Sequence, residues 1–246
     1  MPFDLGLGAS LWMAAAVLIA ALVRGYCGFG YSAMVITASS MVTNPLNFVA
    51  VVVIAEMVMS AQSWSGLSKD VDWKRVKWLL AGAVIGMPLG LWALSFVNED
   101  GARSVVSVYV LTMCLILLVG YRMTRLAGGL ATFGTGIVSG LANAPGMGGL
   151  PVAAFFAAQP MAPAVFRATV VAYFPILDVF SAPLYWMAGL VTWDTAFASA
   201  IVLPLTMLGN WLGGRHFFNS DPQEFRRFAI VLLAILALLG LAKAVI

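Results

Sequence analysis

The residues best suited to bind a ligand lie in residues 24–32 (RGYCGFGYS), inside a long apolar run. These nine residues combine an arginine, a cysteine, two tyrosines, a serine and three glycines. Glycines let a backbone approach a ligand closely, and an arginine fork binds a carboxylate or sulfonate at two points. We therefore expect an anion site here, with candidate ligands Arg24, Gly25, Cys27, Gly28, Gly30, Tyr31 and Ser32.

A second Gly-rich break lies at residues 139–149 (SGLANAPGMGG), within the apolar run 126–158. Paired, Gly-interrupted hydrophobic segments at matching positions of two halves are the best sequence pointer to a transporter's binding site. The helices expected to begin near Phe29 and Met147 would each present unpaired N–H groups, which favour an anion. The second break adds the candidate ligands Asn143, Gly146, Gly148 and Gly149.

Each of these residues also has a purely structural explanation. Glycines in membrane helices are often close-packing points between helices. Arg24 could extend to a membrane interface or pair with a carbonyl, and the polar side chains at the breaks could satisfy freed backbone groups. Both explanations stay open at this point.

Two carboxylates lie within apolar helical segments: Glu56 in residues 45–66 and Asp178 in residues 163–188. Intramembrane carboxylates are functional candidates by default and often carry protons. We therefore assign both to proton coupling, with a structural ion pair or an interhelical hydrogen bond as the alternative. Arg167, near the start of the second segment, is expected to be a charge at the cytoplasmic mouth or a partner of Asp178.

The composition defines the class of protein that must position these side chains. Hydrophobic residues make up 62% of the chain and charged residues 9%, and the mean hydropathy is +0.99. These values predict an all-α polytopic membrane protein, because a soluble domain averages about 25% charged residues. The net charge is +3, and the basic residues lie in short loops, so the charge does not indicate nucleic-acid binding. One histidine and two separated cysteines give no reason to expect a metal, a cofactor or a disulfide. Residues 1–8 lack a basic segment, so we expect no cleavable signal peptide.

Apolar runs and polar punctuation predict ten helical segments, which fall into two repeats. A spacing of 118 residues relates Gly28, Gly30, Pro45 and Phe48 to Gly146, Gly148, Pro163 and Phe166. Residues 1–120 and 121–246 therefore form two repeats of five segments within one membrane domain. The expected segments are 9–23, 29–43, 45–66, 73–97, 102–120, 126–142, 147–160, 163–188, 193–216 and 224–245.

The first two segments of each repeat are expected to form a broken or re-entrant helix pair. Segments 9–23 and 29–43 have about 15 residues each, or roughly 22 Å, which is short of the hydrocarbon core of about 30 Å. If each pair is a hairpin, most loop Lys and Arg residues fall on one side, and the positive-inside rule then favours inverted repeats with both termini outside.

The chain resembles the sulfite exporter TauE/SafE family of membrane permeases. The resemblance rests on residues 25–30 (GYCGFG), on Ser139-Gly140 followed by residues 145–151 (PGMGGLP), and on the proline about fifteen residues after each motif. It implies transport of sulfur-containing or organic anions such as sulfite, thiosulfate or sulfoacetate, and a bacterial inner membrane. Cys27 is suggestive of sulfur chemistry, although a cysteine in apolar sequence is often only a small hydrophobe.

We therefore expect a secondary transporter of small anions, not an enzyme, with the substrate and the lipid bilayer as partners. An uncoupled anion channel is the nearest alternative. A re-entrant-loop membrane enzyme would need clustered carboxylates, and Arg24 has no acidic neighbour in the sequence; a thiol–disulfide carrier would need Cys27 and Cys114 to meet. The particular anion, the direction of flux, the coupling ion and the oligomeric state, with a homo-oligomer as one option, stay open.

Overall fold

The computed structural model describes residue 3 and residues 5–216, except for the side chains at 65–68, 99 and 216. Over this part the chain forms α-helices and no β-strand, so the predicted all-α class is confirmed. The expected segment 224–245 lies outside the described residues. The helices are α1 (Leu7–Cys27), α2 (Tyr31–Ser39), α3 (Val49–Leu67), α4 (Trp73–Leu94), α5 (Glu99–Val119), α6 (Gly129–Asn143), α7 (Gly149–Ala157), α8 (Pro163–Met187) and α9 (Trp193–His216), with short 3-10 helices at Pro45–Phe48 and Ser68–Asp70.

Six of the described helices are long and apolar enough to cross a membrane: α1, α3, α4, α5, α8 and α9. The structure corrects the lengths that were expected for segments 9–23 and 29–43. The helix α1 has 21 residues and α2 only nine, in place of two pieces of similar length. In the second pair α6 has 15 residues and α7 nine.

Local chemistry explains where α1 and α2 end. Gly28 adopts a left-handed conformation with φ of 82°, and its N–H bonds the Arg24 carbonyl, a common way to end a helix. The segment expected to continue to residue 43 stops at Ser39, because hydroxyl groups there bond backbone carbonyls. The bonds run from Thr37 to the Ala33 carbonyl, from Ser39 to Ile36 and from Ser40 to Thr37.

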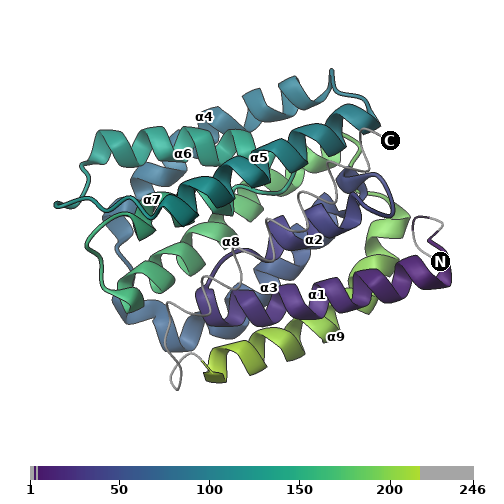
Figure 1. The fold of residues 1–246 in the computed structure, drawn as a ribbon, viewed down its shortest axis with the longest axis horizontal. Coiled ribbons are helices and arrows are strands. Elements are labelled where there is room, and N and C mark those ends of the chain that lie inside the picture. The colour runs from purple at the N-terminus through teal and green to yellow at the C-terminus, as the bar shows by residue number, and fades with distance from the viewer. Residues whose placement is uncertain (1–2, 4, 217–246) are drawn as a thin grey trace.

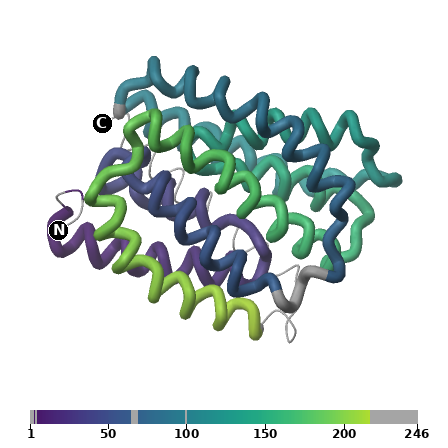
Figure 2. The backbone as a smooth tube through the Cα atoms, turned by 180° about the vertical axis from the view of Figure 1, so that it is seen from behind, coloured from purple at the N-terminus to yellow at the C-terminus, as the bar shows by residue number. Residues whose placement is uncertain are grey.

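The helices α3 and α8 form the centre of the bundle, where they pack against each other. They are the most buried of the six candidate spans. Figure 1 shows α1 and α9 along one side of this centre and α4 and α6 along the other. The view from behind shows α9 running beside α3 (Figure 2). The Arg24, Glu56 and Asp178 side chains therefore come from helices that meet inside the bundle.

Glycines allow the two outer helix pairs to approach closely. On α6, a Cβ at Gly140 would lie 2.6 Å from the Ala83 carbonyl of α4. On α9, a Cβ at Gly209 would lie 2.7 Å from the Ala21 Cβ of α1. Such small-residue contacts are the usual means of helix association in membranes, where lipid offers little hydrophobic drive for association.

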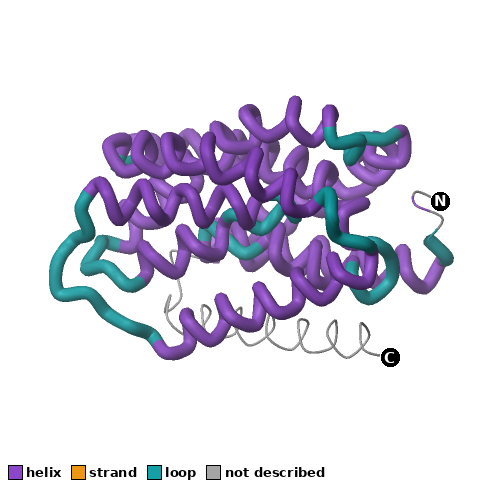
Figure 3. Tube along the Cα trace, turned by 90° about the horizontal axis from the view of Figure 1, so that it is seen from above, coloured by secondary structure: helices purple, strands orange, loops and turns teal. Residues whose placement is uncertain are grey.

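The pairs α1–α2 and α6–α7 each form a hairpin. In both, the chain just before the first helix lies beside the chain that follows the second. The Phe3 ring, before α1, lies 5.3 Å from the Phe48 ring, just before α3. Likewise the Met123 N–H, before α6, bonds the Ala158 carbonyl after α7 at 2.6 Å. The view from above shows loops at both ends of the bundle and further loop segments in its middle (Figure 3).

Exposed aromatic side chains also gather at both ends of the helices. Trp92, Trp186 and Trp193 lie near one end, at 66%, 71% and 84% exposure. Trp64 and Trp73 lie at the α3–α4 turn, with ring centroids 6.1 Å apart. Tryptophan is enriched at both membrane–water interfaces, so this distribution fits a bundle that crosses a bilayer along its helix axes.

Candidate functional site

The first break brings a buried ion pair together. The Arg24 guanidinium, from the last turn of α1, lies 3.3 Å from the Glu56 carboxylate of α3, and the two side chains are 2% and 7% exposed. The same guanidinium donates to the Ser60 hydroxyl at 2.6 Å and to the Glu56 carbonyl at 3.4 Å. Arg24 therefore points into the bundle and is bound by α3.

The N-terminus of α2 faces the same carboxylate. Ser32, the second residue of α2, gives side-chain and backbone hydrogen bonds to Glu56. Tyr31 precedes it, is fully buried, and interacts electrostatically with both Glu56 and Arg24. Gly30, with φ of 94°, starts the helix in a conformation that few other residues adopt. The helix end expected to bind an anion thus holds an anion that the chain itself supplies.

The central helix α8 completes this cluster. The Arg24 guanidinium carbon lies 5.4 Å from the Phe174 ring centre, in cation–π range. One turn further along α8, Asp178 is 1% exposed and interacts electrostatically with Arg24 and Glu56. Its Oδ2 atom has no hydrogen-bond partner within the described part of the chain. We refer to Arg24, Ser32, Glu56, Ser60, Phe174 and Asp178 as the charged cluster.

The sequence missed this pairing. We found no acidic neighbour for Arg24, because its partner Glu56 lies 32 residues away and only the fold brings them together. The repeat did carry a signal. The spacing of 118 residues relates Glu56 to Phe174 and Ser60 to Asp178, and all four lie around Arg24. That spacing takes Glu56 to Phe174, one turn from Asp178, and applying it to Asp178 as well would have identified Ser60.

The second break is held by neutral hydrogen bonds. The Ser139 hydroxyl, in α6, donates to the Gly148 carbonyl at 2.6 Å and lies 2.8 Å from the Tyr173 hydroxyl of α8. The Asn143 amide donates to the Ser181 hydroxyl at 3.0 Å, and the Tyr185 hydroxyl donates to the Asn143 carbonyl. These residues, Ser139, Asn143, Tyr173, Ser181 and Tyr185, form the neutral cluster, of which the sequence had offered only Ser139 and Asn143.

The glycines of the second break have different neighbours, and Gly148 is the one that lies against the neutral cluster. Gly146 has φ of 78°, and its nearest side-chain neighbours would be 3.5 Å or more from a Cβ. A Cβ at Gly148 would lie 2.9 Å from the Asn143 side-chain oxygen, and one at Gly149 would lie 2.7 Å from the Phe174 ring. Phe174 therefore lies against both Arg24 and Gly149, so it links the two breaks.

The remaining residues of the first break lie beside Arg167 of α8. The Arg167 guanidinium donates to the Gly25 carbonyl at 2.6 Å, and a Cβ at Gly28 would lie 3.0 Å from the Arg167 Cγ. Cys27 is half-buried and interacts electrostatically with Arg167. Arg167 thus bonds the end of α1, a contact that the sequence did not suggest. Gly25 also packs against the Asn210 backbone of α9, which gives it a structural role.

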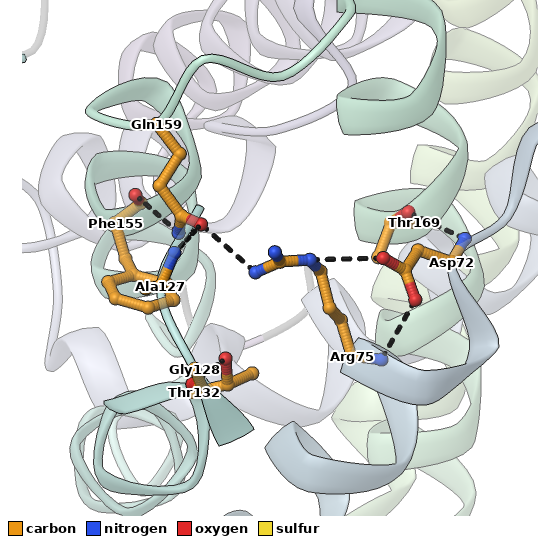
Figure 4. A network of polar contacts seen from close by, with 8 residues as sticks. All are labelled: Asp72, Arg75, Ala127, Gly128, Thr132, Phe155, Gln159 and Thr169. Atoms are coloured by element: carbon orange, nitrogen blue, oxygen red, sulfur yellow. Dashed lines mark hydrogen bonds and ion pairs between the residues drawn. The ribbon is translucent and has the colours of Figure 1, made fainter. Parts of the chain in front are cut away.

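A third polar network lies at the open end of the second hairpin (Figure 4). Arg75 bonds the Asp72 carboxylate and the Gln159 side-chain oxygen, each at 3.0 Å. The Asp72 N–H bonds the Thr169 hydroxyl at 3.0 Å, and the same Gln159 oxygen accepts from the Ala127 N–H. This network ties α4 and α8 to both ends of the hairpin, and its groups bond one another.

Sequence comparison adds one finding to this geometry. A family model described as "Sulfite exporter TauE/SafE" matches residues 13–239, which is most of the chain. A search of curated proteins found no match, and a search of solved structures found none either.

Proposed function

This chain belongs to the sulfite exporter TauE/SafE family, as its two Gly-rich motifs predicted, and on that premise we propose that it is a secondary transporter of small sulfur-containing or organic anions. The members of this family are membrane transporters. Six apolar helices of spanning length are consistent with a multi-pass membrane protein. Sulfite is the substrate class that the family description favours. Thiosulfate and sulfoacetate are chemically similar candidates.

The observation that carries the proposal is the first break. A buried arginine and the N-terminus of α2 converge on one carboxylate there, and the same two groups are suited to a substrate oxyanion. We assign the substrate to the space between the two breaks. Its ligands in this proposal are Arg24, Gly25, Cys27, Gly28, Gly30, Tyr31, Ser32, Asn143, Gly146, Gly148 and Gly149.

We further propose that the two repeats are inverted and that each hairpin re-enters the membrane. Three contacts support this arrangement. The two free ends of the first hairpin lie beside Phe48, at the start of α3. The two free ends of the second hairpin lie near Asp72 and Arg75, beyond the end of α3. Asp72 also bonds Thr169 near the start of α8, so α3 and α8 run antiparallel. The pairing of α1 with α9 has its counterpart in the pairing of α6 with α4.

The charge distribution favours one orientation in a bacterial inner membrane. Lys69, Lys74, Arg75 and Lys77 lie at the α3–α4 turn, and Arg122 and Arg125 in the loop before α6. Basic loops stay in the cytoplasm, so this end of the bundle is proposed to be cytoplasmic.

Glu56 and Asp178 are the proposed proton-coupling residues. Both are buried and near Arg24. Burying an ionisable residue in a membrane protein is energetically costly, so such a residue is a functional candidate by default. An uncoupled anion channel that uses the same site is the second candidate, because the site alone does not require a proton.

Flux in proteoliposomes tests the proposal. Purified protein should export radiolabelled sulfite, and an imposed pH gradient should change the initial rate. Arg24→Lys keeps the charge but loses the two-point geometry, so it should slow transport while the protein stays folded. Flux that ignores the pH gradient would support the channel, and no flux of sulfite, thiosulfate or sulfoacetate would reject the proposal.

A further inference from the structure

The first break offers an anion the Arg24 guanidinium and the N-terminus of α2. The Glu56 side chain contacts both of them. The Glu56 carboxylate lies 3.3 Å from the Arg24 guanidinium and accepts hydrogen bonds from Ser32 at the start of α2. Beside it, the Tyr31 hydroxyl is buried without a hydrogen-bond partner in the described residues. A substrate oxyanion could use the same donors only after Glu56 has left them.

We propose that Glu56 occupies the place of the substrate anion in this conformation, and that the substrate displaces it while one proton binds to the released carboxylate. This inference rests on the proposed function and adds a mechanism of coupling to it. In the exchange, the Arg24–Glu56 ion pair breaks and an Arg24–oxyanion pair forms. The Glu56 carboxylate becomes a carboxylic acid with a proton from solvent.

The charges around Glu56 explain why a proton must accompany the anion. Arg24 of α1 is the cation of the charged cluster, and Asp178 of α8 adds a second carboxylate. The other groups that face Glu56 are the hydroxyls of Tyr31 and Ser32 from α2 and of Tyr185 from α8. From α9, the neutral Asn210 bonds the Met59 carbonyl of α3.

An added oxyanion would therefore leave the charged cluster with at least two negative groups for Arg24, while the neighbouring Arg167 donates to the Gly25 carbonyl. Burying an uncompensated charge is strongly unfavourable, so the displaced carboxylate must become neutral. The expected result is positive linkage: the anion promotes proton binding, and the proton promotes anion binding by the same factor.

Glu56 is the residue that must change its protonation state, because its contacts are the ones that the substrate replaces. Asp178 interacts with Arg24 and Glu56 through its charge, and its Oδ2 atom has no hydrogen-bond partner in the described residues, so the substrate takes over no hydrogen bond of that atom. The number of protons taken up per bound anion should therefore depend on Glu56.

Isothermal titration calorimetry of the full chain in lipid nanodiscs tests this inference. The probe is methanesulfonate, a sulfonate monoanion that does not titrate near neutral pH, with acetate as a second monoanionic probe. Repeating the titration in buffers of different ionisation enthalpy counts the protons taken up. For the wild type we expect about one proton per anion, and a Kd that rises about tenfold for each pH unit while Glu56 is ionised in the free protein.

Glu56→Gln should bind the same anion without proton uptake, with a Kd that no longer depends on pH. Asp100→Asn is the matched control, because its carboxylate lies at the α5 start with a side chain 76% exposed, and it should keep the wild-type proton count. Should Glu56→Gln fail to fold, the wild-type proton count decides alone. Tight binding with no proton uptake by the wild type would overturn the inference but leave the transporter proposal standing, whereas no binding or transport of any probe would overturn both.

Discussion

The two Gly-rich breaks occupy equivalent places in the chain, but their chemistry differs. At the first, Arg24 and Glu56 form a buried ion pair at the start of α2. At the second, Ser139, Asn143 and Tyr185 hold the turn through neutral hydrogen bonds. The spacing of 118 residues relates Arg24 to Ala142, a residue that can carry no charge. The comparison teaches that the two halves share a backbone plan, while one half supplies the charge that can recognise an anion.

Replacing the arginine should produce the largest effect. Arg24→Ala leaves the Glu56 carboxylate buried without its cation, so the free energy of unfolding should fall by about 3–5 kcal/mol and transport should be lost. Denaturation in detergent and sulfite flux measure the two effects.

The double variant Arg24→Ala/Glu56→Gln separates folding from transport. It removes both charges and should regain most of the stability, yet still not transport. A stable, active Arg24→Ala protein would contradict the importance given to the charged cluster.

A smaller effect is expected at the neutral cluster. Tyr185→Phe removes the hydroxyl that bonds the Asn143 carbonyl, which should lower the free energy of unfolding by about 1–3 kcal/mol. Because the lost bond joins two neutral groups, this loss should change little between low and high salt and across pH 6–8. Tyr121→Phe, at a residue 68% exposed, serves as the control and should have no effect. A strong pH dependence of the Tyr185→Phe loss would show that the two breaks are less distinct than their contacts indicate.

The left-handed glycines should behave alike at both breaks. Gly28 and Gly146 have φ of 82° and 78°, so an alanine at either should cost about 1–2 kcal/mol. Gly28→Ala should cost somewhat more, since its Cβ would lie 3.0 Å from the Arg167 Cγ. Gly134→Ala, in open space within α6, should be neutral or slightly stabilising. Chemical denaturation of the three variants checks this order.

The smallest effect is expected at the cysteine. Cys27 is half-buried at the end of α1, and Arg167 beside it bonds the Gly25 carbonyl. If Cys27 contributes only one weak contact to the anion, Cys27→Ala should transport at close to the wild-type rate. Complete loss of flux, together with protection of the thiol by sulfite against alkylation, would give the first break a sulfur chemistry that its neutral counterpart lacks.

The sequence predicted much of the fold because glycine, proline and hydropathy act locally. The break expected within residues 24–32 lies at Gly28, and proline began the segment at Pro45 and the helix at Pro163. The lengths of α1 and α2 were wrong, because α1 continues past Arg24 to the left-handed Gly28 and because hydroxyl bonds accompany the early end of α2. Neither cause can be read from hydropathy alone.

The candidate site was predicted in its parts but not in its pairing. Arg24, Glu56 and Asp178 stood out as charges in apolar segments, which is a local signal. That Arg24 would bind Glu56, and that Phe174 would touch both breaks, depends on how α1, α3 and α8 pack. Such contacts between distant segments become visible only when the helices are packed together.

The most direct test of the account is a thermal-shift comparison of wild type and Arg24→Lys with sulfite, thiosulfate, sulfoacetate, acetate and phosphate. The account predicts that at least one sulfur oxyanion stabilises the wild type selectively, and that the shift shrinks in Arg24→Lys. Equal shifts from all five anions, or a selective shift that Arg24→Lys leaves unchanged, would contradict the claim that the first break recognises the substrate.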